Sequence, residues 1–419
     1  MRFSIRRRGA AVLLPLLATL SSGVAQAEPN IVPVEVSQKG SDLANTLFVD
    51  VTVCDARKQC RTVPNVVVDT GSAGLILSRE ALHGLDLDAV TTSDDRPLHE
   101  LSGFGSGYMW ATVHWARVRI GGIETTEAIP IELFDRPSPG ERLPAGYGRD
   151  MRDARRTGNG ILGISAERYS EGGYAVVAGP GDEPADSGWH PVKVEESRQV
   201  ANPIIHFPEP YNTGSVISLP EVDASQGQKT VQGWLGFGLG EPTAMLFAKD
   251  RPVITHELDA SGRFPFRLGE RPIDVQLDSG AMVLYLDLDF LGLPRHKDQT
   301  NFYDPAALTR VDLSVMSGGH EIKLARTLQI GAADNMDKIE QGYAVLPMLA
   351  MWQGGDVAVL GDPERSMFGL PFFYGRSVAT GLEGAVNPFA PPVAATETLP
   401  EEGQALVTHS PHGFVAFTD

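Results

Sequence analysis

The sequence predicts an all-β protein built from two similar halves. Gly and Pro together contribute 75 of the 419 residues (45 + 30), and so many turn-forming residues favour short strands over long helices. A pattern of apolar strand, Asp, hydroxyl residue and Gly occurs twice, 209 residues apart (278 − 69), which is half the chain. We therefore expect two β lobes, each carrying one copy of this pattern.

Composition and charge exclude several classes of protein. With 42% hydrophobic and 21% charged residues, the chain is not collagen-like, low-complexity or a polytopic membrane protein. A net charge of −18 argues against nucleic-acid partners, because phosphates need a basic face. Two Cys and ten scattered His without a His-Glu-x-x-His motif predict no metal site. Neither a Gly-x-Ser-x-Gly elbow nor a phosphate loop occurs, and we expect no cofactor.

Residues 1–27 have the pattern of a cleavable secretory signal. A basic start is followed by the apolar run Ala10 to Leu20 and by Ala25-Gln26-Ala27, and the apolar run is too short to span a membrane. Ser4 to Arg7 also hints at a twin-arginine signal, although such basic residues are ordinary in any signal. Cleavage would remove four Arg and leave a net charge of −22 (−18 − 4). No Cys lies at the cleavage point, so we expect a periplasmic or secreted protein without a membrane anchor.

The two cysteines lie at the ends of a predicted hairpin loop. Cys54 and Cys60 enclose five polar or small residues, and the apolar runs Leu47 to Val53 and Val63 to Val68 flank them as strands. An exported protein meets oxidising conditions, which favours a disulfide between these cysteines over two free thiols. Because the enclosed loop is short, the expected gain in stability is about 2–3 kcal/mol at most.

The duplicated pattern is the most informative feature of the chain. Val66 to Leu77 reads apolar strand, Asp69-Thr70-Gly71, small residue, apolar strand, and Val275 to Leu286 reads the same around Asp278-Ser279-Gly280. The tripeptide also occurs at Asp186-Ser187-Gly188, but without a strand on either side, which is typical of an ordinary polar turn. Only the first two copies are therefore candidates for chemistry.

Two such loops brought together would form an acid–base pair. Two carboxylates about 3 Å apart cannot both ionise cheaply, so Asp69 and Asp278 would share one proton. The ionised member would then activate a water, while the protonated member polarises a peptide carbonyl. Hydroxyl groups would orient the loops, and Gly would permit the tight turns. The supporting residues are Thr70, Gly71, Ser72, Ser279 and Gly280.

With these motifs the chain resembles the pepsin-like and retropepsin-like aspartic proteases. Gly160 to Ser165 resembles the segment that braces the first Asp loop of that family, and Met367 to Phe373 is the preferred counterpart for the second loop, with Val359 to Asp362 as the alternative. A flap over the substrate is expected around Phe104 to Gly107 and the aromatic residues that follow. The flap and substrate-binding residues implied by the resemblance are Phe104, Gly105, Ser106, Gly107, Tyr108 and Trp110.

A closer resemblance is to an uncharacterised family of exported bacterial proteins with pepsin-like motifs. It rests on Asn65 to Ser72, Trp234 to Gly240, Gly369 to Arg376 and Gly413 to Phe417, and it spans residues 45 to 417. The resemblance implies the pepsin-like fold more firmly than an activity.

Two residues depart from the pepsin pattern. Ala281 stands where many pepsins carry a hydroxyl residue, although active relatives also have Ala there, and Phe104 stands where pepsins have Tyr. Because Ser72 offers Asp69 a hydroxyl donor and Ala281 offers none to Asp278, we expect electrostatically unequal lobes. We expect activity at mildly acidic to near-neutral pH.

The sequence therefore predicts a bilobal pepsin-like protein and an exported aspartic endopeptidase that acts on peptides or unfolded proteins. The alternative is a catalytically silent peptide-binding module. We expect a monomer with an N-terminal lobe over 28–190, a C-terminal lobe over 191–390, and a linker and terminal strand over 391–419. The arginine-rich stretch Glu141 to Arg156 is expected to be a solvated insertion loop, with a basic lid over an acidic cleft as the alternative.

Overall fold

The computed structural model describes residues 28–105, 107–136, 150–152, 157–179, 188–286, 291–298, 301–317, 320–332, 336–352, 365–390 and 410–419. Strands dominate these residues, and the α-helix α1 (Asp337–Glu340) has a single turn. The prediction of an all-β fold is therefore confirmed. Within the described ranges, no helix has the length and apolarity needed to cross a membrane. Several predicted features lie outside the described residues: the signal segment 1–27, Ser106, the turn at Asp186, Val359 to Asp362 and the linker over 391–409.

The first lobe is one part of a large, mostly antiparallel sheet. The second half of β6 alternates buried and half-buried side chains, whereas β4 and β8 are buried throughout. The first-lobe strands are β2 (Leu47–Cys54), β3 (Cys60–Asp69), β4 (Ala73–Ser78), β5 (His99–Phe104), β6 (Gly107–Ile120), β7 (Ile123–Glu124), β8 (Ile129–Phe134), β9 (Gly160–Ile164), β10 (Gly173–Val177) and β11 (Trp189–Pro191). Their order in the sheet is β11-β10-β5-β6-β8-β4-β9-β3-β2, and β7 pairs with β6.

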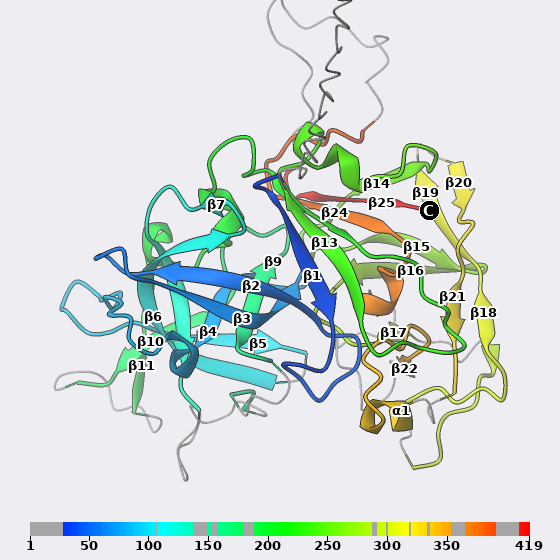
Figure 1. Cartoon of the computed structure of the whole chain (residues 1–419), viewed down its shortest axis with the longest axis horizontal. Helices are drawn as coiled ribbons and strands as arrows, with labels where there is room; N and C mark the ends of the chain where they lie inside the picture. The colour runs from blue at the N-terminus through cyan, green and yellow to red at the C-terminus, as the bar shows by residue number, and fades with distance from the viewer. Residues whose placement is uncertain are drawn as a thin grey trace, which may run out of the picture.

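The same sheet continues between the lobes. β1 (Ile31–Val36) pairs with β2 and, over its full length, with β13 (Val231–Phe237), so the start of the described chain is tied to a segment two hundred residues later. Figure 1 shows β1 beside β13 in the middle of the molecule. The remaining strands of this region are β12 (Gly214–Ser218), β14 (Val253–Glu257), β24 (Ser377–Gly381) and β25 (Phe414–Thr418). The last strand, β25, lies between β24 and β14.

The second lobe has its own sheet, with the order β20-β19-β15-β16-β23-β17-β22. Its strands are β15 (Phe264–Leu268), β16 (Arg271–Leu277), β17 (Leu284–Leu286), β19 (Leu313–Ser317), β20 (His320–Lys323), β22 (Ala350–Trp352) and β23 (Arg365–Phe368). A separate two-stranded ribbon joins β18 (Thr309–Val311) to β21 (Leu328–Ile330). Short 3₁₀ turns connect several strands: η1 (Arg79–Leu82), η2 (Glu196–Arg198), η3 (Pro203–His206), η4 (Glu241–Leu246) and η8 (Leu370–Phe372).

The two Asp-containing loops are built in the same way. In the first lobe, β9 pairs in parallel with β3 before the loop and antiparallel with β4 after it. In the second lobe, β23 pairs in parallel with β16 and antiparallel with β17. The segment beginning at Met367 therefore takes the bracing position, which is the preferred assignment of the sequence analysis. A Cβ on Gly163 or Gly369 would come within 3 Å of backbone atoms of the braced loop, so both bracing segments need Gly there.

The predicted disulfide is present at the tip of the β2–β3 hairpin. Cys54 and Cys60 face each other as a cross-strand pair with their Cα atoms 4.0 Å apart, and their sulfurs are bonded. The strands carry Val side chains inward on both sides of it. The bond closes the hairpin that leads directly into Asp69.

Candidate active site

Two loops meet where the lobes join, and each loop is held by the other. The Thr70 hydroxyl donates to the Leu277 carbonyl at 3.0 Å and accepts from the Ser279 amide at 2.9 Å. The Ser279 hydroxyl in turn donates to the Val68 carbonyl at 2.8 Å and accepts from the Thr70 amide at 3.1 Å. All four groups are buried, so each bond satisfies a polar group that water does not reach. The two loops are therefore locked together with pseudo-twofold symmetry.

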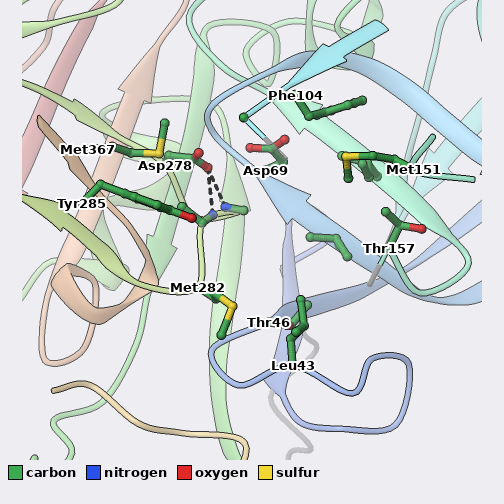
Figure 2. A pocket seen from close by; sticks show the side chains of 15 residues that line it. Leu43, Thr46, Asp69, Phe104, Met151, Thr157, Asp278, Met282, Tyr285 and Met367 are labelled. Atoms are coloured by element: carbon green, nitrogen blue, oxygen red, sulfur yellow. Dashed lines mark hydrogen bonds between the residues drawn. The ribbon is translucent and has the colours of Figure 1, made fainter. Parts of the chain in front are cut away.

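The glycines permit this close approach. A Cβ on Gly71 would lie 2.6 Å from Cγ of Asp278, and a Cβ on Gly280 would lie 2.7 Å from Cγ of Asp69. Because Cβ atoms do not tolerate such contacts, each Gly makes room for the carboxyl group of the opposite loop. The two carboxyl groups consequently lie side by side at the floor of one cavity, as Figure 2 shows.

The hydrogen bonds to the two carboxyl groups differ. Asp69 accepts the Gly71 amide on Oδ1 at 2.7 Å and the Ser72 hydroxyl on Oδ2 at 2.6 Å. Asp278 accepts two backbone amides on Oδ1, from Gly280 at 2.8 Å and Ala281 at 3.1 Å, which are the dashed lines of Figure 2. Asp69 thus has a donor on each oxygen, whereas both donors to Asp278 converge on one oxygen.

Burial and like charge act together on Asp278. Desolvation raises its pKa well above the usual range, and the neighbouring Asp69 charge and the hydrogen bond to Asp69 raise it further, against the opposing effect of the two backbone amides. Within the pair, these effects favour the protonated form of Asp278. Asp69, with a donor on each oxygen, is placed to carry the negative charge.

An apolar cavity of about 160 Å³ lies over the two carboxyl groups. Phe104, Met151 and Tyr285 form its walls around the pair, and Met282 and Leu43 lie farther from it (Figure 2). The remaining apolar lining residues are Val67, Ile161, Ala281 and Met367. Such a lining lowers the local dielectric constant and strengthens electrostatic interactions at the carboxyl groups.

The predicted flap is the hairpin of β5 and β6, in which Phe104 pairs with Gly107. Phe104 and Gly105 line the cavity, as expected for a flap. Trp110 points elsewhere: it is buried, stacks on His99 at 5.4 Å between ring centroids, and meets the edge of Trp189 at 4.4 Å. Tyr108 packs against the same cluster. The aromatic residues after Gly107 therefore anchor the hairpin and do not line the cavity.

A second cavity, of about 430 Å³, adjoins the first loop on its other side and is more polar. Gly71, Ser72 and Phe104 line it, together with Glu167 and Glu171 from the segment after β9. Burial raises the pKa of Glu167 to about 7, and Glu171 contributes through its charge. Arg263 and Gln276 also line this cavity, and the Arg263 guanidinium donates to the Gln276 side-chain oxygen at 3.4 Å. The cleft therefore combines an apolar side with a polar, acidic side.

Some lining residues carry no signal in the sequence. Met151 belongs to the arginine-rich stretch, of which the structure describes Asp150 to Arg152 alone, and its side chain lines the cavity. Arg152 is buried and donates to both carboxyl oxygens of Asp150, from Nε to Oδ1 and from Nη2 to Oδ2, so at this position the stretch is not a solvated loop. Tyr285, Met282 and Glu167 follow the motifs at positions that only the folded chain brings to the cleft. Among the described residues, no group of three or more His, Cys, Asp or Glu could hold a metal ion.

The fold and the paired Asp loops define a protein of the pepsin-like aspartic proteinase fold. The structure superposes on the crystal structure of an aspartic proteinase from Irpex lacteus with a TM-score of 0.50 and 14% identity, over 93% of this chain and 96% of that one. The chain belongs to the family described as "Protein of unknown function (DUF3443)", whose model matches residues 26–394. A search of curated proteins gives no significant match.

Proposed function

We propose that the protein is an exported aspartic endopeptidase that hydrolyses peptide bonds with a water activated by Asp69 and Asp278. One observation carries the proposal: two carboxyl groups from duplicated loops lie against each other at the floor of an apolar cavity, in loops held by reciprocal hydrogen bonds. Such a pair holds one proton and can act as acid and base at once.

The unequal hydrogen bonding supports different roles for the two carboxyl groups in this proposal. Ionised Asp69 removes a proton from water as the water oxygen attacks the carbonyl carbon, while Asp278 gives its proton to the carbonyl oxygen. The resulting tetrahedral diol then collapses: a diol proton returns to Asp278, the proton on Asp69 passes to the amide nitrogen, and the C–N bond breaks. The products are a carboxylic acid and an amine, and the pair is again singly protonated.

The shape of the cleft supports an extended peptide as substrate. The apolar cavity at Phe104, Met151 and Ile161 suits a large apolar side chain beside the cleaved bond. The flap hairpin offers edge backbone groups at Phe104 and Gly105, to which an extended chain could add as a strand. Export through the segment 1–27 agrees with the disulfide at Cys54, since such bonds persist in oxidising compartments.

The test is cleavage of denatured casein by the purified mature protein, with and without pepstatin, across about pH 4 to 7 where a singly protonated pair works. Pepstatin-sensitive cleavage that disappears in Asp278→Asn supports the proposal. Binding of unfolded casein without any cleavage at any pH would instead favour the silent peptide-binding module.

A further inference from the structure

A third cavity lies in the second lobe and shares no lining residue with the cleft. Its volume is about 310 Å³, well above the ~15 Å³ that one water requires. The lining comes from β18, β21 and the segment around η8, and it is mostly polar. The side chains that carry charge into it are Glu221, Arg310, Arg326 and Arg376.

The three arginines are held in different ways. Arg326 donates to Glu221 at 2.9 Å and is one-fifth exposed. Arg376 is almost completely buried, stacks its guanidinium on the Phe372 ring at 4.3 Å, and donates from Nη1 to the Phe372 carbonyl at 2.9 Å. Its Nε has no hydrogen-bond partner among the described residues. Arg310, on β18, is exposed, and its side chain has no polar partner in the same described set.

Positive charge exceeds negative charge around this cavity. The pKa of Glu221 is lowered by its bond to Arg326 and further by Arg251 and Arg376. Burial lowers the pKa of Arg376 to about 10; Asp419 opposes this, whereas Arg326 and Arg251 add to it. Three arginines thus act on Glu221, and Asp419 accepts from the Ala325 and Arg326 amides. A positive field in a chain of net charge −18 attracts anions.

We propose that this cavity binds a small oxoanion between Arg310, Arg326 and Arg376. The planar fork of a guanidinium matches the oxygens of phosphate or carboxylate, and Lys does not reproduce this geometry. The site is independent of peptide cleavage, because its residues lie outside the cleft.

The test is calorimetric titration of the mature protein with inorganic phosphate and, separately, with acetate, at constant ionic strength in a buffer without oxoanions. We expect saturable 1:1 binding of at least one of them, a rise in Tm with its concentration, and at least tenfold weaker binding in Arg310→Gln and Arg326→Gln. Phosphate binding would identify a tetrahedral ligand and acetate binding a planar one.

Arg61→Gln is the matched control, since Arg61 is an exposed arginine of the first lobe, and it should bind like the wild type. Arg326→Gln also breaks the pair with Glu221, so Arg310→Gln, at an exposed position, decides the outcome if Arg326→Gln does not fold. Absence of binding of both anions, or equal affinity in wild type and Arg310→Gln, would overturn the proposal.

Discussion

The two Asp loops share their backbone geometry but differ in their side-chain donors. Both are braced by a parallel and an antiparallel neighbour, and both receive the amide of their Gly on Oδ1. Ser72 adds a hydroxyl donor to Asp69, whereas Ala281 gives Asp278 only a backbone amide. The backbone geometry that both loops share therefore positions the carboxyl groups. The difference between Ser72 and Ala281 makes the two carboxyl groups electrostatically unequal.

The largest expected effect comes from removing either carboxylate. Asp69→Asn and Asp278→Asn should each reduce kcat by about 10²–10⁴-fold or more, because general acid–base catalysis needs both members. Both variants should fold, since Asn has nearly the shape of Asp and cannot add a second negative charge to the pair. Steady-state kinetics on a peptide substrate measures the effect.

Asp274→Asn is the matched control for these variants, because Asp274 is an exposed residue on the strand that leads to Asp278. It should retain wild-type kcat. Wild-type turnover in either Asp69→Asn or Asp278→Asn would show that the pair does not catalyse the reaction.

The next effect concerns the symmetric part of the site. Thr70→Val removes the donor to Leu277 and leaves the buried Ser279 amide unpaired. We expect a loss of about 2–3 kcal/mol in the free energy of unfolding, measured by urea denaturation. Thr70→Ser keeps the hydroxyl and should therefore keep most of the wild-type free energy of unfolding. If Thr70→Val is as stable as Thr70→Ser, the bonds between the loops do not hold the lobes together.

The lobes should also differ in their response to pH. The first lobe buries two carboxyl groups, Glu100 on strand β5 of the flap hairpin and Glu132 on β8. Burial raises the pKa of Glu100 to about 7, and burial together with the Glu100 charge raises that of Glu132 well above its usual range. The groups around them are neutral: Ser102 donates to Glu132, and Ser170, Tyr174 and the Gly172 amide act to lower the pKa of Glu100 against the larger effect of burial.

Raised carboxyl pKa values mean that the folded state binds protons more tightly than the unfolded state. Their contribution to stability is complete below the ordinary pKa of about 4.5 and is lost as pH rises through about 7. We therefore expect amide hydrogen exchange in β5 and β6 to accelerate between pH 6 and 8, about the raised pKa. Glu132→Gln should remove much of this dependence. The exchange rates must first be corrected for the pH dependence of the intrinsic rate. Corrected rates in β5 and β6 that do not change over that range would contradict the prediction.

Much of this site was predictable because short sequence motifs identify several of its residues. The two strand–Asp–Gly segments, the bracing segment at Met367 and the hairpin cysteines each have a signature within about ten residues. The lining of the cleft was not predictable, because Met151, Glu167 and Tyr285 reach it through long-range packing. For Trp110 the sequence predicted a contact that the fold does not make. Its position after the flap motif indicates substrate contact, yet its packing against His99 and Trp189 buries it away from the cavity.

The smallest effect tests the asymmetry itself, through exchange of the residue after each Gly. Activity requires one proton on the pair and falls as pH rises through the upper apparent pKa, which belongs to the pair and not to one residue. Ala281→Ser adds a hydroxyl donor beside Asp278, favours its ionised form, and should move the alkaline limb of the pH–rate profile down by about 0.5–1 unit. Ser72→Ala removes the donor to Asp69 and should move the limb up by a similar amount. Because the two substitutions act in opposite directions, a general loss of activity cannot imitate the result. If the alkaline limb stays in place in both variants, or moves in the same direction in both, the hydroxyl donors do not set the difference between the two loops.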